Sequence, residues 1–360
     1  EIELDRNRAH EIMAVVDRLV LKDGVRSRVA ESVEAALQLD RAGYPVVLVE
    51  KEGQLGGRLR ELSRLFPGEE PAAELLGRKL GLVERSSIKV LTGARLVGAT
   101  RLPDGFAVSL LVGASGEERL LAAAVILAVG YDYFDVREYG EYGCGIYPGV
   151  IDSRELEQHL RKGDLAGLGL QPGQRPAVAF IQCVGSRDRA KGRAYCSRIC
   201  CLYSTRQARQ VREILPQSRV YVFYMDVRAA GRGYEEYYRR AMEESGVFYL
   251  RGRPSKVFPA PGRLLLRFED TLMGTPGELE VDLVVLAGAM LPARDGPWLA
   301  EVLGLGTDGD GFFCGSDCAR PLMAGERVFF AGACGFPVSV EEAIIQGAAA
   351  ASEAAAILEG

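Results

Sequence analysis

The chain has 360 residues, a formal net charge of −5, 26% charged residues and 48% hydrophobic residues. This length allows two domains of ordinary size, and the composition is that of a soluble globular protein. The modest negative charge gives no sign of nucleic-acid binding, and the longest apolar run, Leu120 to Val129, is too short to span a bilayer. Because the first residues are charged and show no secretion signal, we expect a cytoplasmic protein without direct membrane insertion.

Residues 1–37 form an N-terminal segment that differs in character from the rest of the chain. They begin Glu-Ile-Glu-Leu-Asp-Arg-Asn-Arg and end Gly24-Val-Arg-Ser-Arg-Val-Ala-Glu-Ser-Val-Glu-Ala-Ala-Leu37. Both runs resemble the UvrA component of the DNA-repair excinuclease, in the part that leads towards its partner-binding region. The nucleotide-binding motifs of that family are absent here, so the resemblance implies no repair activity.

From Leu37 to about residue 150 the pattern predicts an α/β domain. Ala35 to Ala42 is expected to be helical, Gly43 ends that helix, and Val46 to Val49 has the apolar run of a buried strand. Glu50 follows that strand, at the place where an acidic residue hydrogen-bonds the ribose in dinucleotide-binding folds. Further strands are expected at Lys89–Leu91, Ala107–Val112 and Ala124–Val129.

Half of the cysteines lie between residues 183 and 201, at Cys183, Cys196, Cys200 and Cys201. Cys183 follows the apolar run Ala177 to Gln182, which places it at the carboxyl end of a strand, where open α/β sheets bind ligands. Cys196 and Cys200 are four residues apart, so on a helical turn their thiols share a face, with Cys201 about 100° round. Four thiols at one strand end suit an iron–sulfur cluster.

Other interpretations of these thiols stay open. A structural zinc ion also accepts four thiolates, whereas disulfides fit poorly with adjacent cysteines in a chain without a secretion signal. Inert buried thiols do not require four cysteines in so short a stretch. Three basic residues favour the cluster because they offset the charge of a thiolate-bound centre: Arg187, Arg193 and Arg198.

The same stretch carries a second resemblance. Phe-Ile-Gln-Cys-Val-Gly-Ser-Arg-Asp188 and Tyr-Cys-Ser-Arg-Ile-Cys-Cys201 resemble the iron–sulfur flavoprotein subunit of heterodisulfide reductase, and the resemblance runs from about Ala35 to the C-terminus. It implies two Rossmann-like domains of the FAD/NAD-linked flavoprotein type: an FAD-binding domain at 38–150, completed by 310–360, and a second domain at 151–309. It also implies a [4Fe-4S] cluster at the four cysteines beside an FAD. Such an oxidoreductase subunit passes electrons between the two groups and on to partner iron–sulfur subunits, around a homodimer core.

The resemblance further implies a set of FAD-binding residues, some near Glu50 and others near the C-terminus. The expected flavin-binding turn is missing, because the three glycines of Gly-x-Gly-x-x-Gly would fall on Ser27, Val29 and Ser32. Without them the backbone does not easily approach the FAD pyrophosphate, so the first domain is expected to be N-terminally incomplete. A natural fusion, or an artificial join of two genes at a shared Ala-Leu-x-Leu, explains the change of family. The implied FAD-binding residues are Glu50, Lys51, Gly56, Gly57, Arg58, Gly130, Gly332, Ala333 and Ala343.

A second functional interpretation is a non-redox assembly subunit with a decayed flavin site and a structural metal ion. Cys314 and Cys318 have ligand-like spacing, but ordinary thiols are the default interpretation for them and for Cys144 and Cys334. The aromatic residues around Tyr234 to Tyr238 have helical spacing, which is more typical of packing than of a cofactor site. No Ser-His-Asp arrangement is apparent, so we do not expect hydrolytic chemistry.

Overall fold

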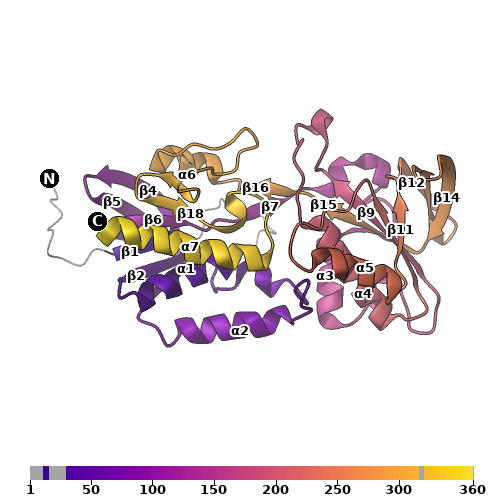
Figure 1. The fold of residues 1–360 in the computed structure, drawn as a ribbon, viewed down its shortest axis with the longest axis horizontal. Helices are drawn as coiled ribbons and strands as arrows, with labels where there is room; N and C mark the ends of the chain where they lie inside the picture. The colour runs from indigo at the N-terminus through magenta and orange to yellow at the C-terminus, as the bar shows by residue number, and fades with distance from the viewer. Residues whose placement is uncertain (1–10, 16–29, 316–319, 360) are drawn as a thin grey trace. The chain divides into compact units, whose positions relative to one another are not determined.

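The structure of the protein is a computed structural model that describes residues 11–15, 30–315 and 320–359. The chain divides into two compact units, which are coloured along the chain in Figure 1. Unit 1 comprises the described parts of Glu1–Arg60, Ala73–Asp132 and Pro292–Gly360, and unit 2 comprises Glu61–Ala72 and Tyr133–Leu291. The division differs from the expected boundaries, since residues 133–150 belong to unit 2 and residues 292–309 belong to unit 1.

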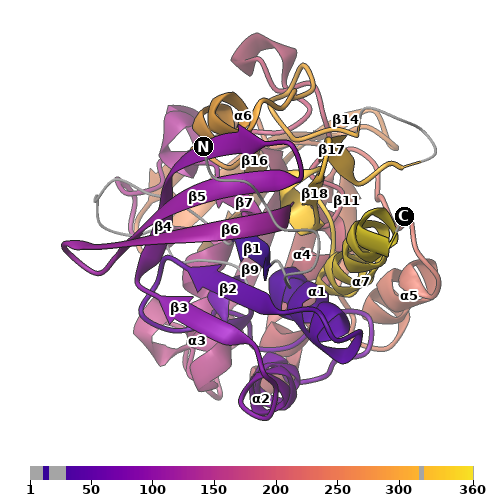
Figure 2. The same cartoon turned by 90° about the vertical axis from the view of Figure 1, so that its left-hand side faces the viewer.

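An eight-stranded sheet organises the described part of unit 1, in the order β17-β18-β6-β1-β2-β3 with β4 and β5 continuing from β6. The pairs within β18-β6-β1-β2-β3 are parallel, and the β4–β5–β6 meander and β17 are antiparallel additions. Figure 2 shows this sheet with its strands side by side. The strands are β1 (Glu11–Val15), β2 (Val46–Glu50), β3 (Lys89–Thr92), β4 (Ala94–Leu102), β5 (Gly105–Val112), β6 (Gly116–Leu127), β17 (Met323–Gly325) and β18 (Val328–Phe330).

Strand β1 takes the central position of the parallel part of this sheet. Its residue Met13 is in register with Val47 of β2 on one side and with Val125 of β6 on the other. The strand position that the sequence analysis expected to be incomplete is therefore filled by residues of the N-terminal segment. What the chain lacks, relative to the flavoprotein pattern, is the glycine-rich turn after this strand.

Four helices belong wholly or almost wholly to unit 1: α1 (Ala30–Arg41), α2 (Ala72–Val83), α6 (Gly296–Leu303) and α7 (Val340–Glu359). Helices α1 and α7 pack along one another, as Figure 1 shows. Gly347 makes this close approach possible, because a Cβ at that position would lie 2.3 Å from the Glu31 carbonyl oxygen. Helix α1 thus depends on a glycine that lies more than three hundred residues further along the chain.

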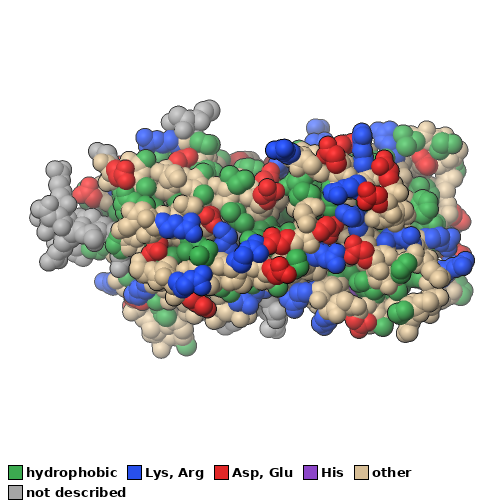
Figure 3. All heavy atoms as spheres, turned by 60° about the horizontal axis from the view of Figure 1, so that its bottom comes forward, with side chains coloured by type: hydrophobic (Ala, Val, Ile, Leu, Met, Phe, Trp, Pro, Cys, Tyr) green, Lys and Arg blue, Asp and Glu red, His purple; other side chains and the backbone are tan. Residues whose placement is uncertain are grey.

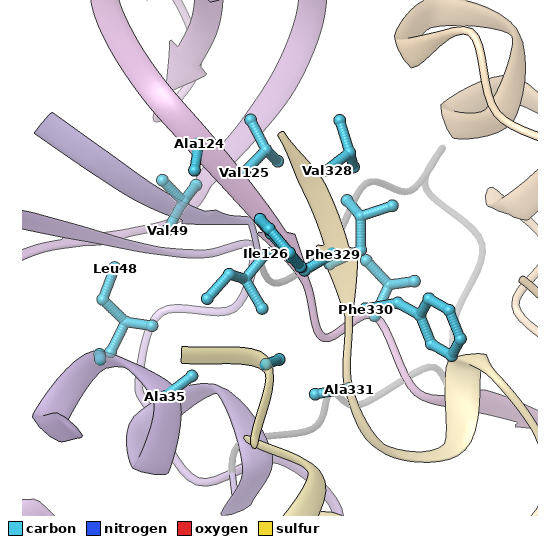
Figure 4. Packing of buried hydrophobic residues seen from close by; sticks show 14 of the residues in the cluster. Ala35, Leu48, Val49, Ala124, Val125, Ile126, Val328, Phe329, Phe330 and Ala331 are labelled. Carbon is cyan, nitrogen blue, oxygen red and sulfur yellow. The ribbon is translucent and has the colours of Figure 1, made fainter. Parts of the chain in front are cut away.

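The core of unit 1 lies where these helices cover the parallel strands (Figure 4). The inner half of β6, Ala122–Leu127, is buried throughout, while its outer half pairs with β5 and is largely accessible. Strands buried on both faces have continuous apolar runs, which explains the strand prediction at Ala124–Val129. The core side chains labelled in Figure 4 come from α1, β2, β6, β18 and the residue after β18: Ala35, Leu48, Val49, Ala124, Val125, Ile126, Val328, Phe329, Phe330 and Ala331.

Unit 2 is built on a second, five-stranded parallel sheet in the order β11-β10-β9-β15-β8. A three-stranded antiparallel sheet, β12-β13-β14, accompanies it. The strands are β8 (Val150–Asp152), β9 (Ala177–Val184), β10 (Arg219–Tyr224), β11 (Phe248–Arg251), β12 (Lys256–Ala260), β13 (Arg263–Asp270), β14 (Thr275–Val281) and β15 (Leu283–Gly288). Its helices are α3 (Ser153–Lys162), α4 (Cys200–Ile214) and α5 (Tyr234–Glu243). Strands β7 (Tyr131–Tyr133) and β16 (Met290–Pro292) pair with each other at two of the four places where the chain passes from one unit to the other.

A buried ion pair joins three segments of unit 2. Arg206 of α4 is 2% exposed and donates through Nη2 to Glu157 of α3, at 2.6 Å. Its Nη1 also donates to Ser63 Oγ, at 2.7 Å, which ties the short segment Glu61–Ala72 into this unit. Burial raises the pKa of the Glu157 carboxyl, but the Arg206 charge and several hydrogen bonds outweigh it, so the pKa is lowered overall.

No helix in the described ranges combines the length and the hydropathy that are needed to cross a bilayer.

Candidate functional site

Cys183 lies at the end of β9, where the backbone departs from regular strand geometry. Its φ is 61°, in the left-handed region that residues with a Cβ rarely adopt. The register between β15 and β9 shifts at the same point, between Leu286 and Gly288. Irregularities of this kind redirect side chains and occur often beside functional sites. The Cys183 side chain is therefore aimed by a local distortion of the strand.

The other cysteines of the motif reach the same place from the N-terminal end of helix α4. Cys200 and Cys201 form its first two positions and are buried, and Cys196 lies in the loop before it. The thiol of Cys200 is hydrogen-bonded to both Cys183 and Cys201, while Cys196 interacts electrostatically with Cys183 and Cys201. The structure therefore brings together the four cysteines that the sequence analysis singled out.

The shared hydrogen bonds change the acidity of these thiols. The hydrogen bond with Cys200, together with nearby arginines, lowers the pKa of Cys183 to about 7 against the effect of burial. The hydrogen bond with Cys200 also lowers the pKa of Cys201. The pKa of Cys200 is raised, because its hydrogen bonds with Cys183 and Cys201 favour the protonated thiol. Burial raises the pKa of Cys196. Two of the sulfurs are thus prepared to carry negative charge.

Backbone amides and a guanidinium surround these sulfurs with hydrogen-bond donors. The amide of Arg198 donates to Cys196 Sγ at 3.3 Å, and the amide of Arg228 donates to Cys201 Sγ at 3.5 Å. The Arg187 side chain is hydrogen-bonded to Cys183 and forms a two-point ion pair with Asp226, at 2.6 and 3.0 Å. Donors of this kind stabilise thiolates and set the potential of an iron–sulfur centre.

Several buried polar atoms close to the cysteines in the sequence have no hydrogen-bond partner among the described residues. Both side-chain polar atoms of Gln182 and the hydroxyls of Ser186 and Ser204 are buried and make no hydrogen bond within the described residues. Such atoms are costly unless a ligand, ion or water satisfies them. Together with the thiols and the amide donors, they fit a thiolate-bound iron–sulfur cluster.

Within the described ranges, no three His, Cys, Asp or Glu side chains are grouped so that they could hold a single metal ion. A lone tetrahedral zinc ion requires its sulfurs about 2.3 Å from one centre. A four-iron cluster has a different requirement, because each thiolate binds an iron of its own.

The FAD-binding residues expected near the first strands lie in unit 1, at the end of β2. Glu50 is fully buried there, and its Oε1 accepts a hydrogen bond from the Glu52 amide at 3.0 Å. Gly56 and Gly57 both have positive φ, and a Cβ on Gly56 would collide with the Arg60 side chain. Arg58 lies over the Tyr131 ring, 5.4 Å from its centre. The positive φ values explain why glycines stand at these two positions, and the FAD-binding roles of these residues stay a prediction.

The remaining implied residues also belong to unit 1. Gly130 follows β6 and Gly332 follows β18, with φ values of 51° and 76°. Ala333 and Ala343 are buried, the latter in the first turn of α7, and Lys51 directly follows Glu50 and is partly exposed. The amide of Gly332 donates to Gln346 Oε1 at 2.8 Å.

The first turn of helix α1 does not fit the pyrophosphate of FAD. In dinucleotide-binding folds, glycines and a helix N-terminus receive the phosphates there. Here the first turn carries Glu31, whose side chain packs against Gly332, and the third glycine position holds the buried Ser32. Ser27 and Val29, at the other two glycine positions, lie outside the described residues. A carboxylate at this helix end disfavours an anionic ligand.

The other cysteines are scattered. Cys144 is half-buried and burial raises its pKa to about 11, Cys314 is exposed, and Cys334 is buried with its thiol donating to the Ala331 carbonyl. Cys318 lies outside the described residues, so the Cys314–Cys318 spacing stays a prediction. Of the aromatic residues in α5, Tyr234 packs edge-on against Phe66 and Tyr237 is fully buried, as the packing interpretation predicts.

Similarity to known proteins agrees with both resemblances. The UvrA interaction domain family matches residues 1–51, which extends past Leu37 into β2. An iron–sulfur A-type subunit of CoB–CoM heterodisulfide reductase from Methanopyrus kandleri is 33% identical over 96% of this chain and 65% of its own length. The corresponding protein of Methanocaldococcus jannaschii is 34% identical over 78% of this chain and 55% of its own length. The chain thus covers less than two thirds of these relatives.

Solved structures show the same fold. Thioredoxin reductase from T. acidophilum aligns with a TM-score of 0.64 over 97% of this chain and 98% of its own, at 14% identity. Thioredoxin reductase from Lactococcus lactis aligns with a TM-score of 0.60 over 98% and 99%, at 15% identity. The expected fold, an α/β architecture of two Rossmann-like domains, is confirmed.

Proposed function

From the premise that the chain, from about residue 35 onward, resembles the iron–sulfur flavoprotein of heterodisulfide reductase, we propose that it is the electron-transfer subunit of an oxidoreductase complex. In this proposal Cys183, Cys196, Cys200 and Cys201 hold a [4Fe-4S] cluster in unit 2. FAD is the second redox group and is held by unit 1. When bound, these groups accept and release electrons, which pass between them and on to partner subunits.

The observation that carries this proposal is the meeting of the four cysteines at the end of β9. The distorted backbone at Cys183 and the first turn of α4 bring thiols together from two elements. Arg187 offsets part of the negative charge, and the amides of Arg198 and Arg228 donate to sulfur. Three of the four cysteines are buried, so the surrounding residues keep water away from their sulfur atoms.

On the flavin side, the proposed roles follow from position. Glu50 would accept a hydrogen bond from the ribose hydroxyl of FAD. The loop with Gly56 and Gly57 would let the backbone approach the cofactor, and Arg58 would face its phosphates. Gly130, Gly332, Ala333, Ala343 and Lys51 complete the proposed set. The first turn of α1 opposes this part of the proposal, because it carries Glu31 and the glycine-rich turn before it is missing.

The partners in this proposal are other iron–sulfur subunits assembled around a homodimer core, in the cytoplasm. The relatives are named as components of multi-subunit reductases, such as the ferredoxin- and F420H2-dependent enzyme of Methanosarcina acetivorans. On the face drawn in Figure 3, acidic and basic side chains are interspersed rather than gathered by sign. Nucleic acid is not among the proposed partners, consistent with the net charge of −5.

The test is the iron, sulfide and flavin content of the protein purified without oxygen, with an electron paramagnetic resonance spectrum after reduction. Wild type is expected to hold about four irons per chain, and Cys183→Ser is expected to lose most of them. Cys144→Ser is the matched control and is expected to keep the iron, because Cys144 lies outside the motif between residues 183 and 201. An iron-free wild type, or equal iron in both variants, would reject the cluster.

The second candidate is a non-redox assembly subunit with a decayed flavin site, and the first turn of α1 favours it. Glu31 against Gly332 and Ser32 at a glycine position both work against the pyrophosphate. The same purification separates the two candidates. Zinc in place of iron, with no flavin, would support the assembly role, whereas an iron signal that responds to dithionite supports electron transfer.

A further inference from the structure

Three loops of unit 2 follow strands β9, β10 and β11, and we call them the basic loops: residues 185–199, 225–233 and 252–255. The three strands are parallel neighbours, so their carboxyl ends lie at the same edge of the sheet. In the first loop, the amide of Arg198 donates to Cys196 Sγ at 3.3 Å. In the second, the amide of Arg228 donates to Cys201 Sγ at 3.5 Å. These two loops therefore contact the sulfurs of the cysteine centre.

The charge of the basic loops is opposite in sign to that of the whole chain. They contain eight basic residues and two aspartates, whereas the chain has a net charge of −5. Both aspartates are bonded within unit 2, Asp188 to the Tyr139 hydroxyl and Asp226 to Arg187 at 2.6 and 3.0 Å. A local excess of positive charge attracts and orients anionic partners. The basic residues are Arg187, Arg189, Lys191, Arg193, Arg198, Arg228, Arg232 and Arg253.

Four of these cations are exposed to solvent: Arg189, Lys191, Arg228 and Arg232. Arg228 interacts with Asp226 at 3.3 Å, and the Lys191 ammonium lies 5.5 Å from the centre of the Tyr139 ring. Arg189 and Arg232 form no ion pair with any residue that the structure describes. An exposed cation without a counter-charge attracts an incoming anion, and this attraction is screened only by salt.

An apolar hairpin tip lies at the same edge of the sheet. Leu272 and Met273, in the turn between β13 and β14, are 64% and 74% exposed. Asp270 Oδ1 fixes this turn by accepting hydrogen bonds from both of their amides, at 2.9 and 3.2 Å. The Thr271 amide donates to the carbonyl of Arg251, the last residue of β11, at 2.8 Å. Methionine and arginine are enriched at protein interfaces, whereas a phosphate backbone requires mainly positive charge, so the tip favours a protein partner.

We propose that the basic loops and the hairpin tip form the docking surface for an acidic electron-carrier protein. This inference rests on the proposed function, because the carrier exchanges one electron with the centre held by the four cysteines. The electron leaves the reduced member of the pair and enters the oxidised member, so no other reactant is needed. The exposed cations steer the acidic carrier to the edge of the sheet where the cysteines lie, and the tip adds apolar contact.

The experiment measures the rate of electron exchange with a small acidic [2Fe-2S] ferredoxin, on the full chain with its iron. Each protein is mixed rapidly with the ferredoxin in the opposite redox state, in both directions, so that one direction is always favourable. R189Q/K191Q/R232Q removes three exposed charges from the basic loops. K162Q/R175Q/R219Q is the matched control, because these exposed residues lie at the end of α3, before β9 and at the start of β10, away from the carboxyl edge.

At low ionic strength, R189Q/K191Q/R232Q is expected to exchange electrons on the order of tenfold more slowly than wild type. In about 1 M salt the two rates are expected to converge, because the Debye length is then about 3 Å. The control has the same net charge as the loop variant and is expected to stay within about twofold of wild type. A small neutral quinone needs no docking surface, so its rate is expected to be equal for all the variants.

The hairpin tip is tested by L272S/M273S. This variant is expected to slow exchange with the ferredoxin about fivefold at every salt concentration, because the lost contact is apolar. I146S is the control, since Ile146 is 72% exposed and lies in the turn before β8, away from the basic loops. An unchanged rate in L272S/M273S overturns the role of the tip.

The remaining outcomes decide the proposal as a whole. A salt-dependent loss of rate that is confined to R189Q/K191Q/R232Q supports it. Equal rates for this variant and wild type overturn it, and so does equal slowing by the control, which is then an effect of net charge alone. Slowing with the quinone as well shows damage to the centre and overturns it.

Two further results concern the class of partner and the centre itself. If R189Q/K191Q/R232Q loses binding of a single-stranded oligonucleotide while its ferredoxin rate is unchanged, the surface binds nucleic acid and the proposal is wrong. A wild type that holds iron but exchanges no electron with the ferredoxin in either direction also overturns it. A wild type without iron rejects the proposed function itself, which is a distinguishable result.

Discussion

The two units of this protein differ in what a redox group would depend on. In unit 2 the proposed ligands are side chains, and all four cysteines arrive at the end of β9. In unit 1 the proposed flavin site depends mainly on backbone conformation at glycines such as Gly57 and Gly332. The missing glycine-rich turn before α1 therefore bears on the proposed flavin site, while all four cysteines of the other site are present. A site that depends on the backbone conformation of one turn is more easily lost than a site made of four side chains.

The largest expected effect concerns the buried ion pair that joins α3, α4 and the segment Glu61–Ala72 in unit 2. Arg206→Met leaves Glu157 buried without its cation and is expected to lower the free energy of unfolding by about 3–5 kcal/mol. Urea denaturation measures it. Arg64→Met is the control, because the Arg64–Glu213 pair is exposed and such pairs contribute about 0–1 kcal/mol. Equal effects of the two substitutions would contradict the importance of burial.

The same carboxylate predicts how stability depends on pH. The pKa of Glu157 is lowered in the folded state from its ordinary value of 4.5, so its contribution is present above that value. It is lost as the pH falls through the lower folded pKa. Wild type is therefore expected to lose more stability than Arg206→Met between pH 6 and pH 3, a window of about three units around the usual glutamate value. If the free energy of unfolding, measured by urea denaturation, depended on pH in the same way for both proteins, this prediction would be contradicted.

An intermediate effect is expected where α1 meets α7 in unit 1. Gly347→Ala places a Cβ 2.3 Å from a carbonyl oxygen of α1, and overpacking of this kind costs about 1–3 kcal/mol. Gly77→Ala in α2 is the matched control, since nothing lies within 4 Å of its Cβ. That control is expected to stabilise the protein by about 0.5–1 kcal/mol, because alanine favours a helix interior. Thermal unfolding of both variants checks the sign of each change.

The smallest expected effect tests the flavin half directly. Glu31→Gln removes a negative charge from the first turn of α1, and charges at helix ends contribute about 0.3–1 kcal/mol. FAD affinity, measured by the quenching of flavin fluorescence, is expected to rise about two- to fivefold. Glu341→Gln, an exposed position in the first turn of α7, serves for comparison. If Glu31→Gln leaves the affinity unchanged, the first turn of α1 is not what disfavours FAD.

Much of this organisation could be predicted from local patterns. The apolar run before Cys183 indicated a strand, and the structure places it at Ala177–Val184. The helix that follows the motif begins at Cys200, so the last two cysteines of the motif form its first two positions. Glycines such as Gly56 and Gly332 have the positive φ values that their proposed roles require.

Other features depend on contacts that a linear pattern does not record. Arg206 of α4 contacts Glu157 and Ser63, which lie 49 and 143 residues away in the sequence. These separations follow no period, so no sequence signal marked the contacts. The packing of Glu31 against Gly332 joins opposite ends of the chain in the same way. Sequence reasoning singled out the four cysteines, while the charged groups around them became visible only in the three-dimensional structure.

The division of the chain also bears on the order of events during synthesis. Unit 2 is complete once Leu291 has been made, because its two pieces are Glu61–Ala72 and Tyr133–Leu291. Unit 1 is complete only after β18 (Val328–Phe330) and α7 have been made, because β18 is a strand of its sheet and α7 packs against α1. On a ribosome, the cysteine-bearing half is therefore expected to mature first, while the N-terminal half waits for the end of translation.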